Sequence, residues 1–353
     1  MSMKKRALGA SGIEVGVLGM GCWQFGGGKG SYWGEQSQSD VDEVVHKALD
    51  AGMNYFDTAE VYNDGDSEIA LGIALKGRRH QAVIGSKIST SNTRSSVLRA
   101  HCEASLKRLQ TDYIDLYMLH WPLSPLAVKH FTKDAGLIEN PPQVPEVFDT
   151  LHALQKEGKI RHIGLSNHGV MQMKEVQATG VPVVANELAY NLLSRAIEAS
   201  ILPYCVESKV GIIGYMPLLQ GLLTGKYATI DELGPMQSRT RHFHHSRGEG
   251  TRHGEEGAEA EIHRALREIR QLADELGVHM AVLSLAWAAA NEAVSTTIVG
   301  SRNIAQLDLN IQGAVYELSL DILTRLNEMT EPVLHKLGDN PDYYENRFNS
   351  RTC

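Results

Sequence analysis

Short apolar runs alternate with longer segments of helical periodicity along most of this chain of 353 residues. Eight apolar runs have the length of a β-strand, and a helical or loop segment follows each of them: 15–21, 54–58, 82–87, 113–120, 160–167, 181–187, 210–217 and 295–301. Alternating strands and helices predict a parallel sheet, and eight such units predict an α/β fold of the closed (β/α)8 TIM-barrel type. The runs are almost wholly apolar, as expected for strands buried on both faces.

Three features complete the predicted architecture. Residues 6–21 predict a small N-terminal β-hairpin that leads into the first barrel strand. Residues 40–52 have helical periodicity and end in Gly, a common residue just after a helix. No second domain is evident, so residues 1–353 are predicted to form a single barrel domain.

Two long segments interrupt the alternation, at 124–143 and 227–256. We expect them to be loops on the rim of the barrel, where long loops often serve as lids. The polar and aromatic tail after Pro332 is expected to fold back over the barrel mouth.

Polar and glycine residues gather where the predicted strands end. They are Asp57, Lys87, His120, Ser166 with Asn167, Glu187, Tyr215, and Gly300 with Ser301. The C-terminal ends of parallel barrel strands share one rim, and active sites of barrel enzymes lie there. This coincidence favours a catalytic rim over scattered polar caps.

Four side chains at or just beyond three successive strand ends can move a proton: Asp57, Tyr62, Lys87 and His120. A phenol is a weak acid, with an ordinary pKa of about 10, so it needs a neighbouring cation to donate a proton at neutral pH. Lys87 could supply that charge, Asp57 could hold the ammonium, and His120 could orient an incoming oxygen. The pattern predicts general acid catalysis on a carbonyl group.

Composition narrows the classes of function. A formal net charge of −8 argues against a nucleic-acid-binding surface. The four cysteines, at 22, 102, 205 and 353, form no C-x-x-C pair, a pattern typical of reduced thiols in the cytoplasm. No N-terminal signal pattern and no apolar run of membrane-spanning length is present. We therefore expect a cytoplasmic protein without membrane or nucleic-acid partners.

Six segments resemble those of the aldo-keto reductase superfamily, in the same order and at suitable intervals. They are GMGCWQFGG (19–27), FDTAEVYNDGDSEIALGIAL (56–75), LHWP (119–122), GKIRHIGLSN (158–167), GYMPLLQGLLTGKY (214–227) and VGSRNIAQLDLN (299–310). The likeness covers nearly the whole chain and is greatest to bacterial branches that also resemble potassium-channel β subunits. It implies a barrel enzyme that reduces carbonyl groups with NADPH.

The resemblance also implies a role for each catalytic side chain. Tyr62 would be the proton donor to the substrate carbonyl oxygen, with its pKa lowered by Lys87. Asp57 would pair with Lys87, and His120 would position the substrate. Trp23, at the end of the first strand, would form a wall of the substrate pocket, although plain core packing would explain it as well.

A nicotinamide cofactor extended across the rim is implied in the same way. Ser166 and Asn167 match the residues that bind the carboxamide, and Tyr215 matches the aromatic residue that stacks on the nicotinamide ring. The other expected cofactor contacts, running from the nicotinamide through the pyrophosphate to the adenosine, are Cys22, Trp23, Asp57, Glu187, Pro217, Leu218, Gln220, Lys226, Arg239, Gly300, Ser301, Arg302, Gln306 and Asn310.

Two residues bear on the cofactor. The guanidinium of Arg302 suits a 2′-phosphate in charge and geometry, so NADP(H) is favoured while NAD(H) stays possible. Glu187 stands where the family usually has Gln, so either this contact is altered or Glu187 is protonated.

Other functions compete with this interpretation. A regulatory or redox-sensing subunit could hold NADPH with slow turnover, and a lysine-dependent aldolase or metal hydrolase could use the same fold. The histidines of segment 242–253 lack the carboxylate or cysteine company of a catalytic metal site, so no metal is expected. The substrate, a small carbonyl compound or alcohol, and the oligomeric state stay open.

Overall fold

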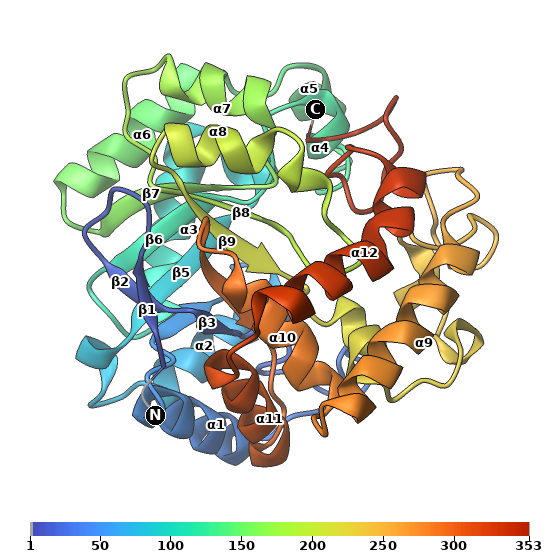
Figure 1. Cartoon of the computed structure of the whole chain (residues 1–353). Helices are drawn as coiled ribbons and strands as arrows, with labels where there is room; N and C mark the ends of the chain where they lie inside the picture. The colour runs from blue at the N-terminus through green and yellow to red at the C-terminus, as the bar shows by residue number, and fades with distance from the viewer. Residues whose placement is uncertain (1–2, 353) are drawn as a thin grey trace.

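The computed structural model describes residues 3–352 and contains the predicted barrel (Figure 1). Eight parallel strands close on themselves in the order β10-β3-β4-β5-β6-β7-β8-β9. Their bounds are β3 (Leu18–Gly21), β4 (Tyr55–Asp57), β5 (Val83–Ile88), β6 (Ile114–Leu119), β7 (Ile160–Ser166), β8 (Ala185–Ala189), β9 (Gly211–Tyr215) and β10 (Val294–Val299). Every predicted strand is present, so the TIM-barrel prediction is confirmed.

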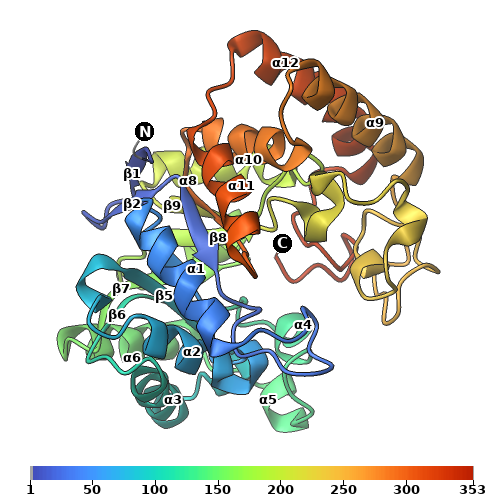
Figure 2. The same ribbon diagram turned by 90° about the horizontal axis from the view of Figure 1, so that it is seen from below.

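Helices follow the strands and surround the barrel (Figures 1 and 2). They are α1 (Gln38–Asp50), α2 (Asp66–Ala74), α3 (Ser95–Arg108), α4 (Pro125–Val128), α5 (Ala135–Glu139), α6 (Val144–Lys156), α7 (Val170–Gln177), α8 (Ile201–Glu207), α9 (Glu259–Glu275), α10 (Met280–Ala290), α11 (Ile304–Val315) and α12 (Leu320–Leu337). Within residues 3–352, no single helix is long and apolar enough to cross a membrane, and α9 with α10 reaches that length only as a pair bent by 100°.

Helix α1 shows how the local sequence sets these elements. Its N-cap is Ser37, whose side chain accepts a hydrogen bond from the Asp40 backbone N–H, so the helix begins two residues before the predicted start. Val41, Val44 and Ala48 recur at helical spacing on the buried face.

The predicted hairpin consists of β1 (Lys5–Ala7) and the antiparallel β2 (Glu14–Gly16). The apolar run 15–21 is therefore shared between β2 and β3, where a single strand was expected. Leu8 and Val15 of this region are fully buried against residues of the barrel interior, so the hairpin contributes to the barrel core.

The two interrupting segments are not plain loops. Segment 124–143 holds the short helices α4 and α5, and segment 227–256 holds two short 3-10 helices. Cys22, Cys102 and Cys205 are free and buried, while Cys353 lies outside the described residues.

Tyr55 fills the interior of the barrel where two neighbouring strands carry glycine. Its side chain is fully buried, and its hydroxyl has no hydrogen-bond partner. A Cβ added at Gly85 would lie 2.2 Å from the Tyr55 hydroxyl oxygen, and one added at Gly19 would lie 2.9 Å from Tyr55 Cδ1. The missing side chains at these two positions make room for the phenol ring.

Gly85→Ala is expected to lower the free energy of unfolding by about 1–3 kcal/mol, because it overpacks the barrel interior. Adding Tyr55→Phe should restore part of the loss, since it removes the oxygen nearest the new Cβ. Urea denaturation measures both effects. Gly28→Ala is the matched control, because a Cβ there meets nothing within 4 Å. Equal stability of Gly85→Ala and the parent protein would contradict this account of the packing.

Candidate active site

The barrel brings Asp57, Lys87 and Tyr62 together around one ammonium group. Lys87 Nζ donates hydrogen bonds of 2.6 Å to both carboxylate oxygens of Asp57 and one of 3.1 Å to the Thr58 carbonyl oxygen. It also lies 3.3 Å from the Tyr62 hydroxyl. Lys87 is fully buried, and although burial acts to lower its pKa, the Asp57 carboxylate raises it above the ordinary value. It is therefore a fixed positive charge.

Tyr62 is held by an unusual turn. It begins the 3-10 helix η1 (Tyr62–Gly65), in which Asn63 and Asp64 have φ angles of 48° and 54°. The Asn63 side chain donates to the carbonyl oxygens of Trp23 (2.9 Å) and Phe25 (2.7 Å), which offsets the cost of the left-handed backbone. Burial raises the pKa of Tyr62 above its ordinary value, while Lys87 acts to lower it.

His120 completes the predicted group of four at the end of β6. Its ring centroid is 5.9 Å from that of Tyr62, in an edge-on arrangement. Its Nδ1 is buried and has no hydrogen-bond partner. Desolvation, with Lys87 as a second cause, lowers the pKa of His120 well below its usual range. The imidazole is therefore neutral and can form a hydrogen bond with an arriving oxygen.

Glu187 is a second carboxyl group on the same ammonium. Its Oε1 lies 3.3 Å from Lys87 Nζ, whereas its buried Oε2 accepts no hydrogen bond. Burial and the charge of Asp57 raise the pKa of Glu187 well above its ordinary value. Burial also raises the pKa of Asp57, but the hydrogen bonds from Lys87 oppose that shift. Of the two alternatives for Glu187, the structure supports the protonated one.

The residues expected at the nicotinamide end lie beside His120. Tyr215 donates a 2.8 Å hydrogen bond to Asn167 Oδ1. Asn167 Nδ2 in turn donates to the His120 carbonyl oxygen (3.1 Å) and to Ser166 Oγ (3.0 Å). These contacts hold Tyr215 and the Ser166–Asn167 pair next to His120.

The segment after β9 contains the expected pyrophosphate contacts. Leu219, Gln220 and Gly221 have φ angles of 43°, 56° and 94°, a left-handed run that shapes the chain here. Arg239 lies between the rings of Tyr32 (5.8 Å) and Tyr344 (5.2 Å), and its Nε is buried without a hydrogen-bond partner. A buried donor without an acceptor fits an anionic ligand such as a phosphate.

The remaining predicted contacts follow the same rim. Pro217 is buried and Leu218 half-buried beside Tyr215, and Lys226 is exposed. Cys22 is fully buried, and burial raises the pKa of its thiol, which disfavours the reactive thiolate. Trp23 stacks on Tyr62 at 5.7 Å, which places it beside the phenol of Tyr62 and not in the apolar core.

The expected adenosine end is built on the N-terminus of α11. Asn310 donates to Ser301 Oγ (2.9 Å) and to the Gly300 carbonyl oxygen (3.3 Å). The backbone N–H of Arg302 donates to Gln306 Oε1 at 2.8 Å. The Arg302 guanidinium is exposed. Within the described part of the chain, its hydrogen bond goes to a backbone oxygen, the Glu35 carbonyl at 2.6 Å.

Sequence reasoning missed the loop 26–36. Tyr32 stacks on Trp23 at 5.1 Å and donates a hydrogen bond to Gln220 Oε1 in the segment after β9. Trp33 packs edge-on against Tyr32 at 4.7 Å. Two adjacent aromatic residues inside a glycine-rich stretch, directly after a strand end, were the signal that could have indicated this loop.

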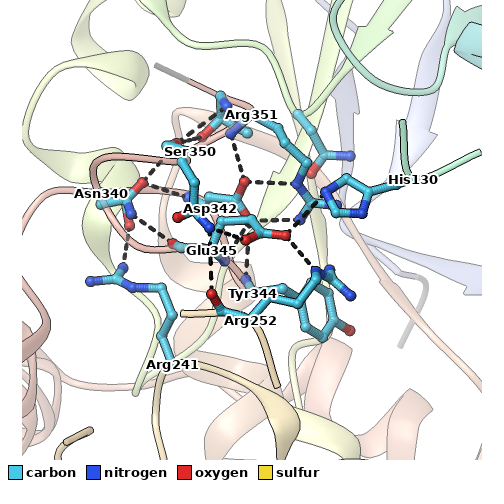
Figure 3. Close-up of polar contacts among 12 residues, drawn as sticks. His130, Arg241, Arg252, Asn340, Asp342, Tyr344, Glu345, Ser350 and Arg351 are labelled. Carbon is cyan, nitrogen blue, oxygen red and sulfur yellow. Dashed lines mark hydrogen bonds and ion pairs between the residues drawn. The ribbon is translucent and has the colours of Figure 1, made fainter. Parts of the chain in front are cut away.

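The C-terminal tail folds over the rim, as expected, and a buried ion pair holds it in place (Figure 3). Asp342 accepts hydrogen bonds of 2.6 and 2.9 Å from the Arg351 guanidinium. The guanidinium also lies 3.7 Å from the ring of Trp121, which follows His120. Glu345 joins the tail to both interrupting segments, through Arg252 and through His130 Nε2 at 3.1 Å.

The segment rich in histidine and arginine is packed against the protein. His242 and His253 are buried. Burial lowers the pKa of His242 to about 3 and the pKa of His253 to about 4, so both are neutral. The arginines of this segment form ion pairs: Arg241 with Glu255, Arg247 with both Asp231 and Glu259, and Arg252 with Glu345. Residues 3–352 contain no group of three His, Cys, Asp or Glu residues arranged to hold a metal ion.

Fold and site together define a (β/α)8 barrel with acid–base groups gathered at its C-terminal rim. The sequence matches the Aldo/keto reductase family over residues 17–331, so the chain belongs to that family and is an oxidoreductase.

Similar proteins carry related names. The aldo-keto reductase YhdN of Bacillus subtilis is 35% identical over 234 residues, which are 64% of this chain and 65% of that protein. The NADH-specific methylglyoxal reductase of Escherichia coli is 33% identical over 242 residues, 63% of this chain and 70% of that protein. A solved aldo/keto reductase of Klebsiella pneumoniae, in complex with NADP and acetate, has 26% identity and a TM-score of 0.69, and the match covers 93% of this chain and 96% of that one.

The raised pKa of Glu187 leads to a prediction about stability. Where the folded protein holds a proton that the unfolded chain has lost, stability falls as pH rises, by about 1.4 kcal/mol per pH unit for one proton. This window runs from the ordinary pKa of Glu up to the raised pKa of Glu187. Glu187→Gln has no such proton to hold in this pH window. The free energy of unfolding of the variant, minus that of the parent, should therefore increase with pH by about 1.4 kcal/mol per pH unit. Denaturant unfolding at several pH values between 5 and 8 measures it, and a constant difference would contradict the protonated assignment.

Proposed function

We propose that this protein is an NADPH-dependent oxidoreductase that interconverts small carbonyl compounds and alcohols, with Tyr62 as general acid and base. The observation that carries the proposal is the Tyr62 hydroxyl, 3.3 Å from the fully buried ammonium of Lys87. A fixed cation stabilises the tyrosinate that remains after the proton has been donated. Aldehydes, ketones and sugar-like hydroxycarbonyls are the expected substrates.

Each residue of the site has a separate role in the proposed reduction of a carbonyl group. A nicotinamide cofactor, when bound, would supply a hydride to the carbonyl carbon. Tyr62 gives its proton to the carbonyl oxygen, and neutral His120 donates a hydrogen bond to the same oxygen. Asp57 keeps the Lys87 ammonium in place through both transfers. In alcohol oxidation, the tyrosinate takes the proton back.

Arg302 favours NADPH over NADH. Its guanidinium is exposed and donates a hydrogen bond to the Glu35 carbonyl oxygen. A 2′-phosphate would give Arg302 a charged partner that NADH lacks. The NADP complex of the Klebsiella pneumoniae protein supports this choice, while the name of the Escherichia coli relative keeps NADH as the competing cofactor.

The rival functions have less support. A lysine that forms a Schiff base must lose its proton, whereas the neighbours of Lys87 raise its pKa. We therefore do not propose an aldolase. A regulatory subunit with slow turnover has no specific contact in residues 3–352 in its favour.

Tyr62→Phe is expected to lower kcat by about 10²–10⁴-fold, because it removes the proton donor. The Kd for NADPH should stay within about twofold, since the ring and its stacking on Trp23 are kept. Steady-state kinetics and fluorescence titration measure the two quantities. Tyr316→Phe, the same change at a remote position after α11, is the control. An equal loss of binding and turnover would refute the assigned role of Tyr62.

Arg302→Ala is expected to weaken NADPH binding by about 10–100-fold, the usual worth of a charge-assisted hydrogen bond to phosphate. NADH binding should hardly change. Separate titrations with NADPH and NADH, following intrinsic fluorescence, give both values. Arg264→Ala removes an exposed arginine of α9 and serves as control. A preference of the parent protein for NADH would overturn the 2′-phosphate assignment but would leave the oxidoreductase standing.

A further inference from the structure

The cluster around Lys87 contains two carboxyl groups but one ammonium group. Asp57 from β4 and Glu187 from β8 both contact the single ammonium of Lys87 from β5. All three side chains are at least 96% buried. With Glu187 protonated the charges of the three residues cancel, whereas with Glu187 ionised one negative charge is left in a site that excludes water.

Among residues 3–352, the groups that act on the pKa of Glu187 include no cation besides Lys87. The titratable neighbours in the site are Asp57, Lys87, Tyr55, Tyr62, Tyr215 and, beyond Lys87, His120. The three tyrosines are neutral, because burial raises the pKa of each phenol, and His120 is neutral as well. A positive charge that arrived beside Glu187 would therefore have a large effect on its proton.

Glu187 is attached to the residues that we expect to hold the nicotinamide. Its carbonyl oxygen accepts hydrogen bonds from the Asn167 backbone N–H (2.8 Å) and from Ser166 Oγ (3.2 Å). Tyr215, on the other neighbouring strand, is bonded to Asn167. The acid is thus part of the wall made by β7, β8 and β9.

The two redox forms of the cofactor differ in charge at this wall. The oxidised nicotinamide ring carries one positive charge, and the reduced ring is neutral. We propose that Glu187 follows the redox state of the nicotinamide, holding a proton beside NADPH and releasing it to solvent beside NADP⁺. This proposal rests on the proposed function, because it takes the nicotinamide to lie against Tyr215 and Asn167.

Glu187 in this role is a positioning residue for charge and does not touch the transferred hydride. Loss of its proton leaves a carboxylate that attracts the oxidised ring. By reciprocity, the oxidised ring makes that loss easier. The affinity for NADP⁺ relative to NADPH therefore rises with pH, by at most tenfold per pH unit for a single proton.

The test compares the ratio of the two dissociation constants at several pH values. The parent protein is titrated with NADP⁺ and, separately, with NADPH from pH 5.5 to 9 by fluorescence. The 2′-phosphate titrates in both forms, so its effect cancels in the ratio. We expect Kd(NADP⁺)/Kd(NADPH) to fall by about three- to tenfold per pH unit over part of this range. Glu187→Gln should give a flat ratio, and Glu292→Gln, at an exposed position, should behave as the parent.

A second measurement needs no variant. Calorimetric titrations in buffers of different ionisation enthalpy count the protons released on binding, and NADP⁺ should release up to one more proton than NADPH. A slope that persists in Glu187→Gln, or equal proton release for the two forms, would overturn the proposal. A parent protein that binds both forms with a flat ratio would defeat this inference alone. A parent protein that binds neither would defeat the proposed function itself.

Discussion

The site depends on the ion pair between the buried ammonium of Lys87 and the carboxylate of Asp57. An unpaired charge in a barrel interior would cost several kcal/mol, so Asp57 must stay ionised and close to it. That pair fixes a positive charge 3.3 Å from the Tyr62 hydroxyl. Without this charge a buried phenol would be a very poor acid, because burial disfavours the tyrosinate. Glu187 then has no remaining cation of its own and keeps its proton, which makes it responsive to any charge that binds nearby.

Closure of the barrel makes this arrangement possible. Asp57 on β4 and Lys87 on β5 come from neighbouring strands, whereas Glu187 comes from β8, which closure of the sheet brings near them across the barrel interior. Closure also requires a filled interior, to which Tyr55 contributes by occupying the space that Gly85 leaves on the neighbouring strand. The chemistry at one end of the barrel therefore rests on close packing beneath it.

The rim is covered by segments that are far apart in the sequence. The tail pairs Asp342 with Arg351, and Glu345 connects it to both interrupting segments (Figure 3). From the other side, loop 26–36 reaches Gln220 through Tyr32. These contacts are polar and specific, so they set the shape of the mouth in which a substrate would lie.

The sequence by itself determined the eight strands and predicted four acid–base residues at their ends, because apolar runs with polar ends follow directly from burial and barrel geometry. Only the tertiary structure decided that Glu187 shares the ammonium of Lys87, since the two are 100 positions apart in the chain and meet through closure. The same holds for Arg241, Arg247 and Arg252, whose carboxylate partners no local pattern could reveal. Local periodicity is written in the sequence, whereas long-range pairing depends on how distant segments pack.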